Sequence, residues 1–140
     1  MKHKGCILRF TSNRNKELMA AYRKALASTS HIDMAEVSEI IVNTPCSRFW
    51  VSEERATNVI VSIIKGYPVL DNMRPLKREM FLDIYELVKQ YSEECPDMPL
   101  SDVIMKAVNS PAKKFYMKPR CAMEIIYKIK KGHYEKYRLH

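Results

Sequence analysis

The chain has 140 residues, of which 46% are hydrophobic and 29% charged, and its formal net charge is +8. This composition argues against a disordered protein. No apolar run approaches the roughly 20 residues of a membrane span. Charges interrupt the apolar residues at the N-terminus at once, so we expect no signal peptide. We therefore expect one compact cytoplasmic domain over residues 1–140, large enough to bury its own core.

The charge is unevenly spread along the sequence. Residues 1–24 hold seven Lys and Arg against one Glu, a net +6. Residues 25–105 hold seven against thirteen acidic residues, a net −6, and residues 106–140 hold ten against two, a net +8. Basic ends around an acidic middle favour a polyanionic partner, nucleic acid first. A solvated surface that aids solubility would give the same pattern.

The first half of the chain predicts three helices. Residues 1–11 are expected to be a basic arm, and a first helix is predicted from Ser12 or Asn13 to about residue 27. Asp33, followed three residues later by a glutamate, resembles a capping box and predicts the start of a short second helix. A loop follows, and Ser52 is the expected N-cap of a third helix that ends at Gly66.

The second half repeats this order. Residues 67–74 are expected to link the two halves, and Pro75 is expected to open a long helix that ends near residue 94. Ser101 is the expected N-cap of a short fifth helix. Pro119 is expected to begin a sixth helix, which Gly132 stops. Residues 133–140 are expected to form a basic tail. The predicted fold is therefore all-α, with six helices.

The sequence contains an internal repeat. When the chain is shifted by 66 positions, residues 42–66 align with residues 108–132 without a gap, and nine of the 25 positions are identical. Repeats indicate the architecture before any single element does. We expect two tandem long helix–short helix–loop–helix units, at about 12–66 and 75–132. The identical pairs are Val42/Val108, Asn43/Asn109, Pro45/Pro111, Phe49/Phe115, Ala56/Ala122, Ile60/Ile126, Ile63/Ile129, Lys65/Lys131 and Gly66/Gly132.

The apolar residues of each copy predict its core. The third and sixth helices carry stripes at i, i+3, i+4 and i+7, which is typical of a buried helix face. Aromatic residues in the preceding loops, Phe49 and Trp50 in one copy and Phe115 and Tyr116 in the other, are expected to plug each core. Base stacking is the alternative role for these rings. The residues expected to be buried are Phe49, Ile60, Ile63, Phe115, Ile126 and Ile129.

Few residues offer catalytic or metal-binding chemistry. The histidines at positions 3, 31, 133 and 140 stand at no ligand spacing from a cysteine or carboxylate. There are only three glycines, and no phosphate loop, HExxH motif or nucleophile elbow. We expect no enzyme activity, no cofactor and no metal. The scattered cysteines at 6, 46, 95 and 121 are expected to be reduced thiols.

A short helix followed by a loop and a second helix invites comparison with helix-turn-helix DNA readers. The turn here is eight or nine residues instead of three or four, so the motif would be a variant. The second copy is the more basic one, and the expected nucleic-acid contacts are Lys113, Lys114, Lys118, Arg120, Lys128 and Lys131, with Arg48 from the first copy. Arg48 and Lys114 could instead bond helix C-terminal carbonyls.

Three stretches carry a family resemblance: PCSRFWVSEERA at 45–56, MRPLKREMF at 73–81 and PAKKFY at 111–116. They resemble small basic helical proteins, functionally unassigned, of Bacteroides-type genomes and prophages. The resemblance implies a bacterial or phage cytosolic setting and supplies no catalytic or binding residues.

The leading interpretation is a non-enzymatic nucleic-acid-binding protein, DNA before RNA, regulatory or accessory to a phage or mobile element. The alternative is a protein-interaction or assembly module, such as a phage adaptor or structural accessory protein, whose basic ends meet an acidic protein.

Overall fold

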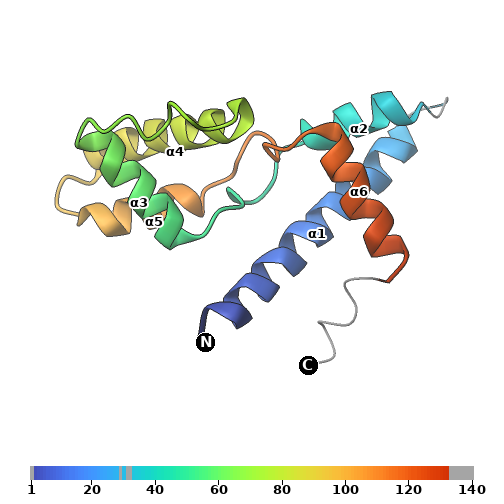
Figure 1. Cartoon of the computed structure of the whole chain (residues 1–140), viewed down its shortest axis with the longest axis horizontal. Coiled ribbons are helices and arrows are strands. Elements are labelled where there is room, and N and C mark those ends of the chain that lie inside the picture. Colours follow the sequence, from blue (N-terminus) through green and yellow to red (C-terminus); the bar gives the residue numbers. More distant parts are fainter. Residues whose placement is uncertain (1, 29, 31–32, 133–140) are drawn as a thin grey trace. The chain divides into compact units, whose positions relative to one another are not determined.

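In a computed structural model the described part of the chain, residues 2–28, 30 and 33–132, consists of helices joined by turns and loops (Figure 1). Side chains are described from Thr11 onward, and the predicted basic tail at 133–140 lies outside the described residues. The all-α prediction with six helices is confirmed. The helices are α1 (Lys2–Ser28), α2 (Met34–Val42), α3 (Glu53–Ile64), α4 (Pro75–Glu94), α5 (Leu100–Val108) and α6 (Pro119–Lys130).

Local signals set most of the helix ends. Asp33 accepts a hydrogen bond from the backbone N–H of Ala35 at 3.0 Å, and Ser52 accepts one from Arg55 at 3.1 Å, as expected of N-caps. Pro75 and Pro119 are the first residues of α4 and α6. After α3 and α6 the chain turns at glycines in the left-handed region, with φ of 84° at Gly66 and 76° at Gly132. A residue without a Cβ adopts this conformation without strain.

Two predicted starts are wrong. The first helix begins at Lys2, not at Ser12 or Asn13, so the backbone expected to be a loose arm is helical. That segment contains no proline, and the single Gly5 costs a helix only about 1 kcal/mol, so no local signal stops α1 there. The fifth helix begins at Leu100 after Pro99, and Ser101 therefore lies inside it and is not its N-cap.

The helices divide into two compact units. Unit 1 comprises Met1–Thr44 and Met117–His140, and it holds α1, α2 and α6. Unit 2 is the intervening segment Pro45–Tyr116, and it holds α3, α4 and α5. Within unit 1 all three helices pack on one another, and the same is true within unit 2. Each unit thus takes a long and a short helix that follow each other in the sequence, and a third helix from the other half of the chain.

This division corrects the expected linker. Residues 67–74 do not separate two units, because they join α3 to α4 inside unit 2. The packing of α3 on α4 and α5 makes this segment a turn within one bundle. The helix pairs expected to form helix–loop–helix units are also divided, since α2 and α5 lie in different units from α3 and α6 respectively.

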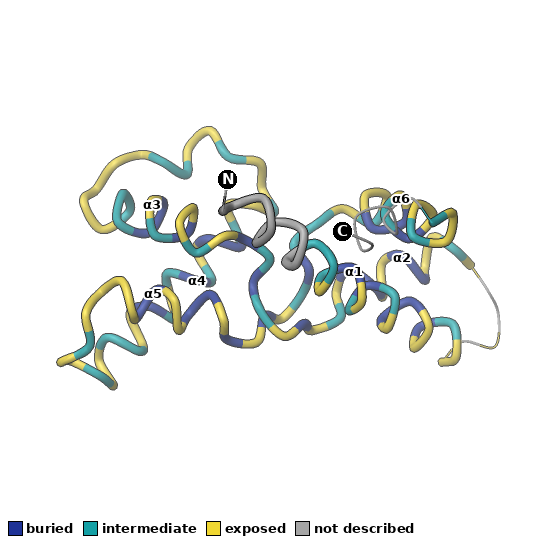
Figure 2. Tube along the Cα trace, turned by 90° about the horizontal axis from the view of Figure 1, so that it is seen from below, coloured by how far each residue is buried: buried dark blue, intermediate teal, exposed yellow. Residues whose placement is uncertain are grey.

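The core of unit 1 is formed by one apolar side from each helix, seen as dark blue stretches in Figure 2. Leu18 and Tyr22 of α1 are buried one turn apart. Ile41 of α2 and Ile126 of α6 are fully buried. Full burial of such a side chain stabilises the fold by about 1.5–3 kcal/mol. The other buried apolar residues of these helices are Ala21, Ala25, Val37, Val42, Ala122 and Met123.

Among the side chains that the structure describes, unit 2 buries more apolar residues than unit 1, and both loop phenylalanines belong to its core. Phe49 and Phe115 are buried as predicted, as is Ile60. Ile63 and Ile129 were expected to be buried, but both are partly exposed. Each lies in the last turns of a twelve-residue helix whose short partner has only nine residues. The remaining core of unit 2 is Cys46, Val51, Ala56, Val59, Met80, Phe81, Ile84, Val88, Val103, Ile104, Ala107, Val108 and Ala112.

The two repeated loops pair with each other inside unit 2. The backbones of Cys46 and Ala112 exchange two hydrogen bonds of 2.9 Å in an antiparallel bridge. The N–H of Phe49 donates to the carbonyl of Val108 at 3.0 Å, so the first loop is fixed to the end of α5. The ring of Phe49 stacks on that of Tyr116, with centroids 5.8 Å apart. This burial supports the core-plug role over base stacking for Phe49 and Phe115.

Candidate nucleic-acid interface

The seven residues predicted to contact nucleic acid fall into both units. Four of them, Lys118, Arg120, Lys128 and Lys131, belong to unit 1 through α6 and its flanking residues. The other three, Arg48, Lys113 and Lys114, belong to the loops of unit 2. The two groups have different surroundings.

The net charge of the chain lies entirely in unit 1. The sequence of unit 1 holds fourteen Lys and Arg against six Asp and Glu, which gives +8. The sequence of unit 2 holds ten of each sign and is neutral. A strong excess of one sign on a single folded body raises the local concentration of an oppositely charged partner. Unit 1 is therefore the part of the chain that holds the excess of positive charge.

The outer face of α6 carries part of this charge. Arg120, Lys128 and Lys131 are exposed, and they share the side of the helix opposite the buried Ala122 and Ile126. Figure 2 shows the resulting alternation of exposed and buried stretches along α6. Lys118, the N-cap residue of the helix, is also exposed. The same outer face includes Cys121, Glu124 and the half-exposed ring of Tyr127.

A polar contact accompanies the apolar packing of α6 on α1. The Lys130 Nζ donates a hydrogen bond to the hydroxyl of Tyr22 at 3.0 Å and lies 4.9 Å from the centre of that ring. The ammonium–ring contact adds about 0.5–1 kcal/mol at an exposed site. This lysine therefore orients the helix, while the cationic residues on the opposite side stay in solvent.

Arg48 acts within its own loop. Its guanidinium donates to the carbonyl of Phe49 at 3.0 Å and to that of Val51 at 2.8 Å, and it lies 5.7 Å from the centre of the Trp50 ring. Burial lowers the pKa of Arg48, and the charge of Glu53 partly offsets this. The carbonyls of Phe49 and Val51 belong to the loop that leads into α3. Arg48 thus stabilises the backbone turn that leads into α3.

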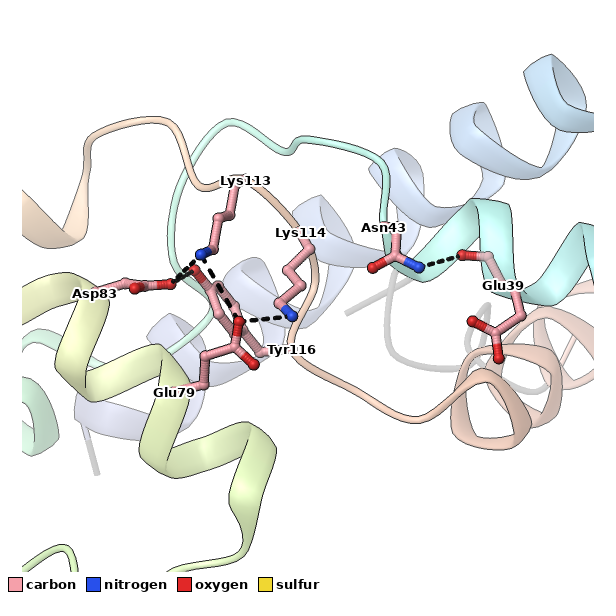
Figure 3. Close-up of polar contacts among 7 residues, drawn as sticks. All are labelled: Glu39, Asn43, Glu79, Asp83, Lys113, Lys114 and Tyr116. Atoms are coloured by element: carbon pink, nitrogen blue, oxygen red, sulfur yellow. Dashed lines mark hydrogen bonds and ion pairs between the residues drawn. The ribbon is translucent and has the colours of Figure 1, made fainter.

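Lys113 and Lys114 bind carboxylates of α4 (Figure 3). The Nζ of Lys114 lies 2.6 Å from Oε2 of Glu79, and this lysine side chain is only 22% exposed. The Nζ of Lys113 lies 3.3 Å from Oδ2 of Asp83 and 3.8 Å from Oε2 of Glu79. The two predicted phosphate ligands are thus neutralised by two acids one helical turn apart.

Tyr116 completes this cluster. Its hydroxyl donates to Oδ2 of Asp83 at 2.5 Å, and its backbone has a φ of 57°, which is uncommon for a residue other than glycine. Burial raises the pKa of Tyr116, and the hydrogen bond to Asp83 raises it further. The pairing of Tyr116 with Asp83 was not predicted from the sequence. The signal available was the i, i+4 spacing of Glu79 and Asp83, which places both on one face of a helix.

No protein-family model, curated protein or solved structure matches this chain. Among the residues that the structure describes, no helix combines the length and apolar character required to cross a bilayer. Within the same residues, no three His, Cys, Asp or Glu side chains are grouped as metal ligands would be. The described cysteines, Cys46, Cys95 and Cys121, are not joined by disulfides.

Proposed function

We propose that this chain is a non-enzymatic, cytoplasmic nucleic-acid-binding protein that prefers duplex DNA to RNA and serves a phage or mobile element as a regulatory or accessory factor. The observation that carries the proposal is the concentration of the whole net charge in unit 1. The resemblance of its sequence to basic prophage-type proteins supports the setting. Unit 1 supplies the binding surface in this proposal.

In this proposal α6 is the helix that approaches the duplex. DNA readers of the helix-turn-helix class present one helix to the major groove and brace it with others. Within unit 1, α6 is braced by α1 and α2 and turns Arg120, Lys128 and Lys131 to solvent. These residues span about 16 Å along a helix that rises 1.5 Å per residue, which is enough to meet several phosphates. Lys118 adds a fourth contact at the start of the helix.

The proposal leaves out three residues that the sequence had suggested. Lys113 and Lys114 are paired with acids of α4, and Arg48 bonds carbonyls of its own loop. A phosphate would have to compete with these internal acceptors, and a paired lysine loses its present partner when it turns outward. Unit 2 is therefore not part of the proposed interface.

We also infer that the two sequence copies are structural repeats that have exchanged their last helices. The short helices α2 and α5 have nine residues each, and α3 and α6 have twelve each, with bounds that differ by the same 66 positions as the sequence alignment. Aligned residues share burial, such as Ile60 with Ile126 and the partly exposed Ile63 with Ile129. In each unit the long and short helices of one copy receive the last helix of the other.

One observation favours the alternative of a protein-interaction module. Large apolar side chains are exposed on unit 2, namely Ile64, Tyr67, Leu82, Leu100 and Met105. A neutral unit with such residues suits a partner bound through apolar contacts. Such a contact would persist at high salt, whereas phosphate contacts weaken.

The test is a titration of the full chain against a labelled random-sequence DNA duplex, followed by fluorescence anisotropy across a salt series. Each lysine or arginine that neutralises a phosphate contributes a log–log slope of about −0.9. The proposal expects binding at low salt with a slope of at least about −3, and weaker binding to a matched RNA duplex. A chain that binds neither duplex at low salt would refute the proposal and favour the interaction module.

A further inference from the structure

The loop of unit 2 contains two adjacent lysines, and each forms an ion pair with an acidic side chain of α4. Lys114 lies against Glu79 and over the ring of Tyr116, whose centre is 5.7 Å from its Nζ. Lys113 lies against Asp83, yet its own side chain is 64% exposed. The cluster therefore has two cations and two anions, and it adds no net charge to the unit.

The Asp83 carboxylate and the loop that carries the two lysines are held in place by further contacts. Asp83 accepts the hydroxyl of Tyr116 as well as the Lys113 ammonium. Tyr116 is itself fixed by stacking on Phe49. The loop backbone is held as well, because the thiol of Cys46 donates to the carbonyl of Lys114 at 3.3 Å. Asp83 and the loop backbone that carries both lysines are therefore positioned by the fold.

Carboxylate and phosphate oxygens compete for the same ammonium donors. Both are anionic acceptors that form short, charge-assisted hydrogen bonds with lysine. The lysine side chain is long and flexible, so it can turn from one acceptor to another. Glu79 and Asp83 thus form ion pairs with Lys113 and Lys114, which would otherwise make a second cationic patch on the chain.

We propose that Glu79 and Asp83 are an internal competitor for phosphate, which masks Lys113 and Lys114 and restricts polyanion binding to unit 1. This inference rests on the proposed nucleic-acid function and concerns a contact that inhibits it. In this proposal unit 1 binds the nucleic acid, while Glu79 and Asp83 of α4 prevent the loop lysines of unit 2 from binding phosphates non-specifically. Neutralising the acids would release both lysines.

The experiment uses the full chain with Glu79→Gln and Asp83→Asn together, titrated against the random DNA duplex across a salt series. Release of two lysines is expected to tighten low-salt binding at least tenfold and to steepen the log–log slope by about 1.8. The matched control is Glu93→Gln with Glu94→Gln, two exposed acids on the same helix. This control changes the net charge equally, away from the loop lysines.

A second pair of variants makes the result specific. Lys113→Ala with Lys114→Ala is expected to leave wild-type binding almost unchanged and to abolish the gain in the Glu79→Gln, Asp83→Asn background. Should the doubly neutralised chain fail to fold, as judged by circular dichroism, Glu79→Gln alone keeps the Tyr116–Asp83 bond and is expected to steepen the slope by about 0.9.

The outcomes separate the two proposals. The masking contact would be refuted if Glu79→Gln with Asp83→Asn had the same effect on DNA binding as the Glu93→Gln, Glu94→Gln control. It would also be refuted if the tighter binding persisted after both lysines were replaced. Binding by the wild type would still support the nucleic-acid function. Absence of binding by the wild type and by every variant would overturn the nucleic-acid function, and the masking contact with it. Binding that appears only after the acids are neutralised would support masking and refute the role of unit 1.

Discussion

Unit 1 and unit 2 are built from the same three kinds of helix, one long, one of nine residues and one of twelve, but they manage charge differently. Unit 1 carries the whole excess of eight positive charges, and it presents Arg120, Lys128 and Lys131 to solvent. Unit 2 is neutral, and it pairs the lysines of its loop with Glu79 and Asp83. The same helical frame thus accommodates an outward-facing cationic surface in one case and an internally satisfied cluster in the other.

The difference shows that charge must be counted by folded unit, not by sequence segment. Along the sequence, the basic stretch after residue 105 includes Lys113, Lys114, Lys118 and the residues of α6. The fold divides that stretch after Tyr116 and gives its two parts different surroundings. Four predictions test this comparison.

The largest effect concerns the buried isoleucines that occupy aligned positions. Ile60→Ala and Ile126→Ala each remove a fully buried side chain and are expected to cost about 2–5 kcal/mol. The helices that lose protection identify the packing. We expect Ile60→Ala to lower amide hydrogen-exchange protection in α4 and α5, and Ile126→Ala to lower it in α1 and α2. The reverse assignment would mean that each copy packs on itself.

The second prediction compares exposed cations of the two units. Alanine at Lys118, Arg120, Lys128 and Lys131 is expected to flatten the salt dependence of DNA binding by about 3.6 units, because four phosphate contacts are lost. Fluorescence anisotropy measures the slope. The matched control replaces four exposed basic residues of unit 2, Arg55, Lys65, Arg74 and Lys77, and is expected to change it by less than about one unit. An equal decrease of the slope in both sets of variants would show that the exposed cations of unit 1 do not bind DNA preferentially.

The third prediction concerns the two helix-ending glycines. Gly66 and Gly132 both have positive φ, and a Cβ built on Gly66 meets no atom within 4 Å. Gly66→Ala therefore introduces backbone strain alone, and a net loss of about 1 kcal/mol is expected in urea unfolding. Gly132→Ala is expected to cost a similar amount if the two turns are equivalent. An unchanged free energy of unfolding for either variant would show that the backbone of that turn adjusts to a negative φ without cost.

The smallest effect at neutral pH is expected from Tyr116→Phe, which removes the hydroxyl bound to Asp83. Because burial raises the pKa of Tyr116, its stabilising contribution is present below the usual tyrosine pKa of about 10. The contribution is lost as the pH rises above that value, since the unfolded chain releases its proton first. Urea unfolding at pH 9 and pH 11 should therefore show a shallower decline for the variant. Tyr67→Phe, at a ring that is 62% exposed, is the control.

Local chemistry made much of the fold predictable from the sequence. The starts at Pro75 and Pro119, the caps at Asp33 and Ser52 and the stop at Gly66 each depend on a few neighbouring residues, and all were found as predicted. The apolar stripes gave the buried faces for the same reason. The true start of α1 at Lys2 was not predicted, because no proline or capping residue marks it. Helix ends that lack such signals are the least determined by the sequence.

The partners of each helix could not be predicted. An apolar stripe such as that around Ile60 shows which face is buried but not which helix covers it, and the short helices α2 and α5 offer similar apolar faces. The exposed positions of Arg120 and Lys128 followed from the stripe on α6. The pairing of Lys113 and Lys114 with α4 did not follow, because it depends on the path of a loop, which periodicity does not describe.

The interrupted course of unit 1 has a consequence for synthesis. Unit 2 is a continuous segment, so all of its residues are synthesised before α6. By contrast, α1 and α2 leave the ribosome first and wait with Leu18, Val37 and Ile41 uncovered until α6 follows. Nascent chains usually complete their N-terminal parts first. Here we expect unit 1 to be completed last, and the uncovered faces of α1 and α2 to favour aggregation until α6 arrives.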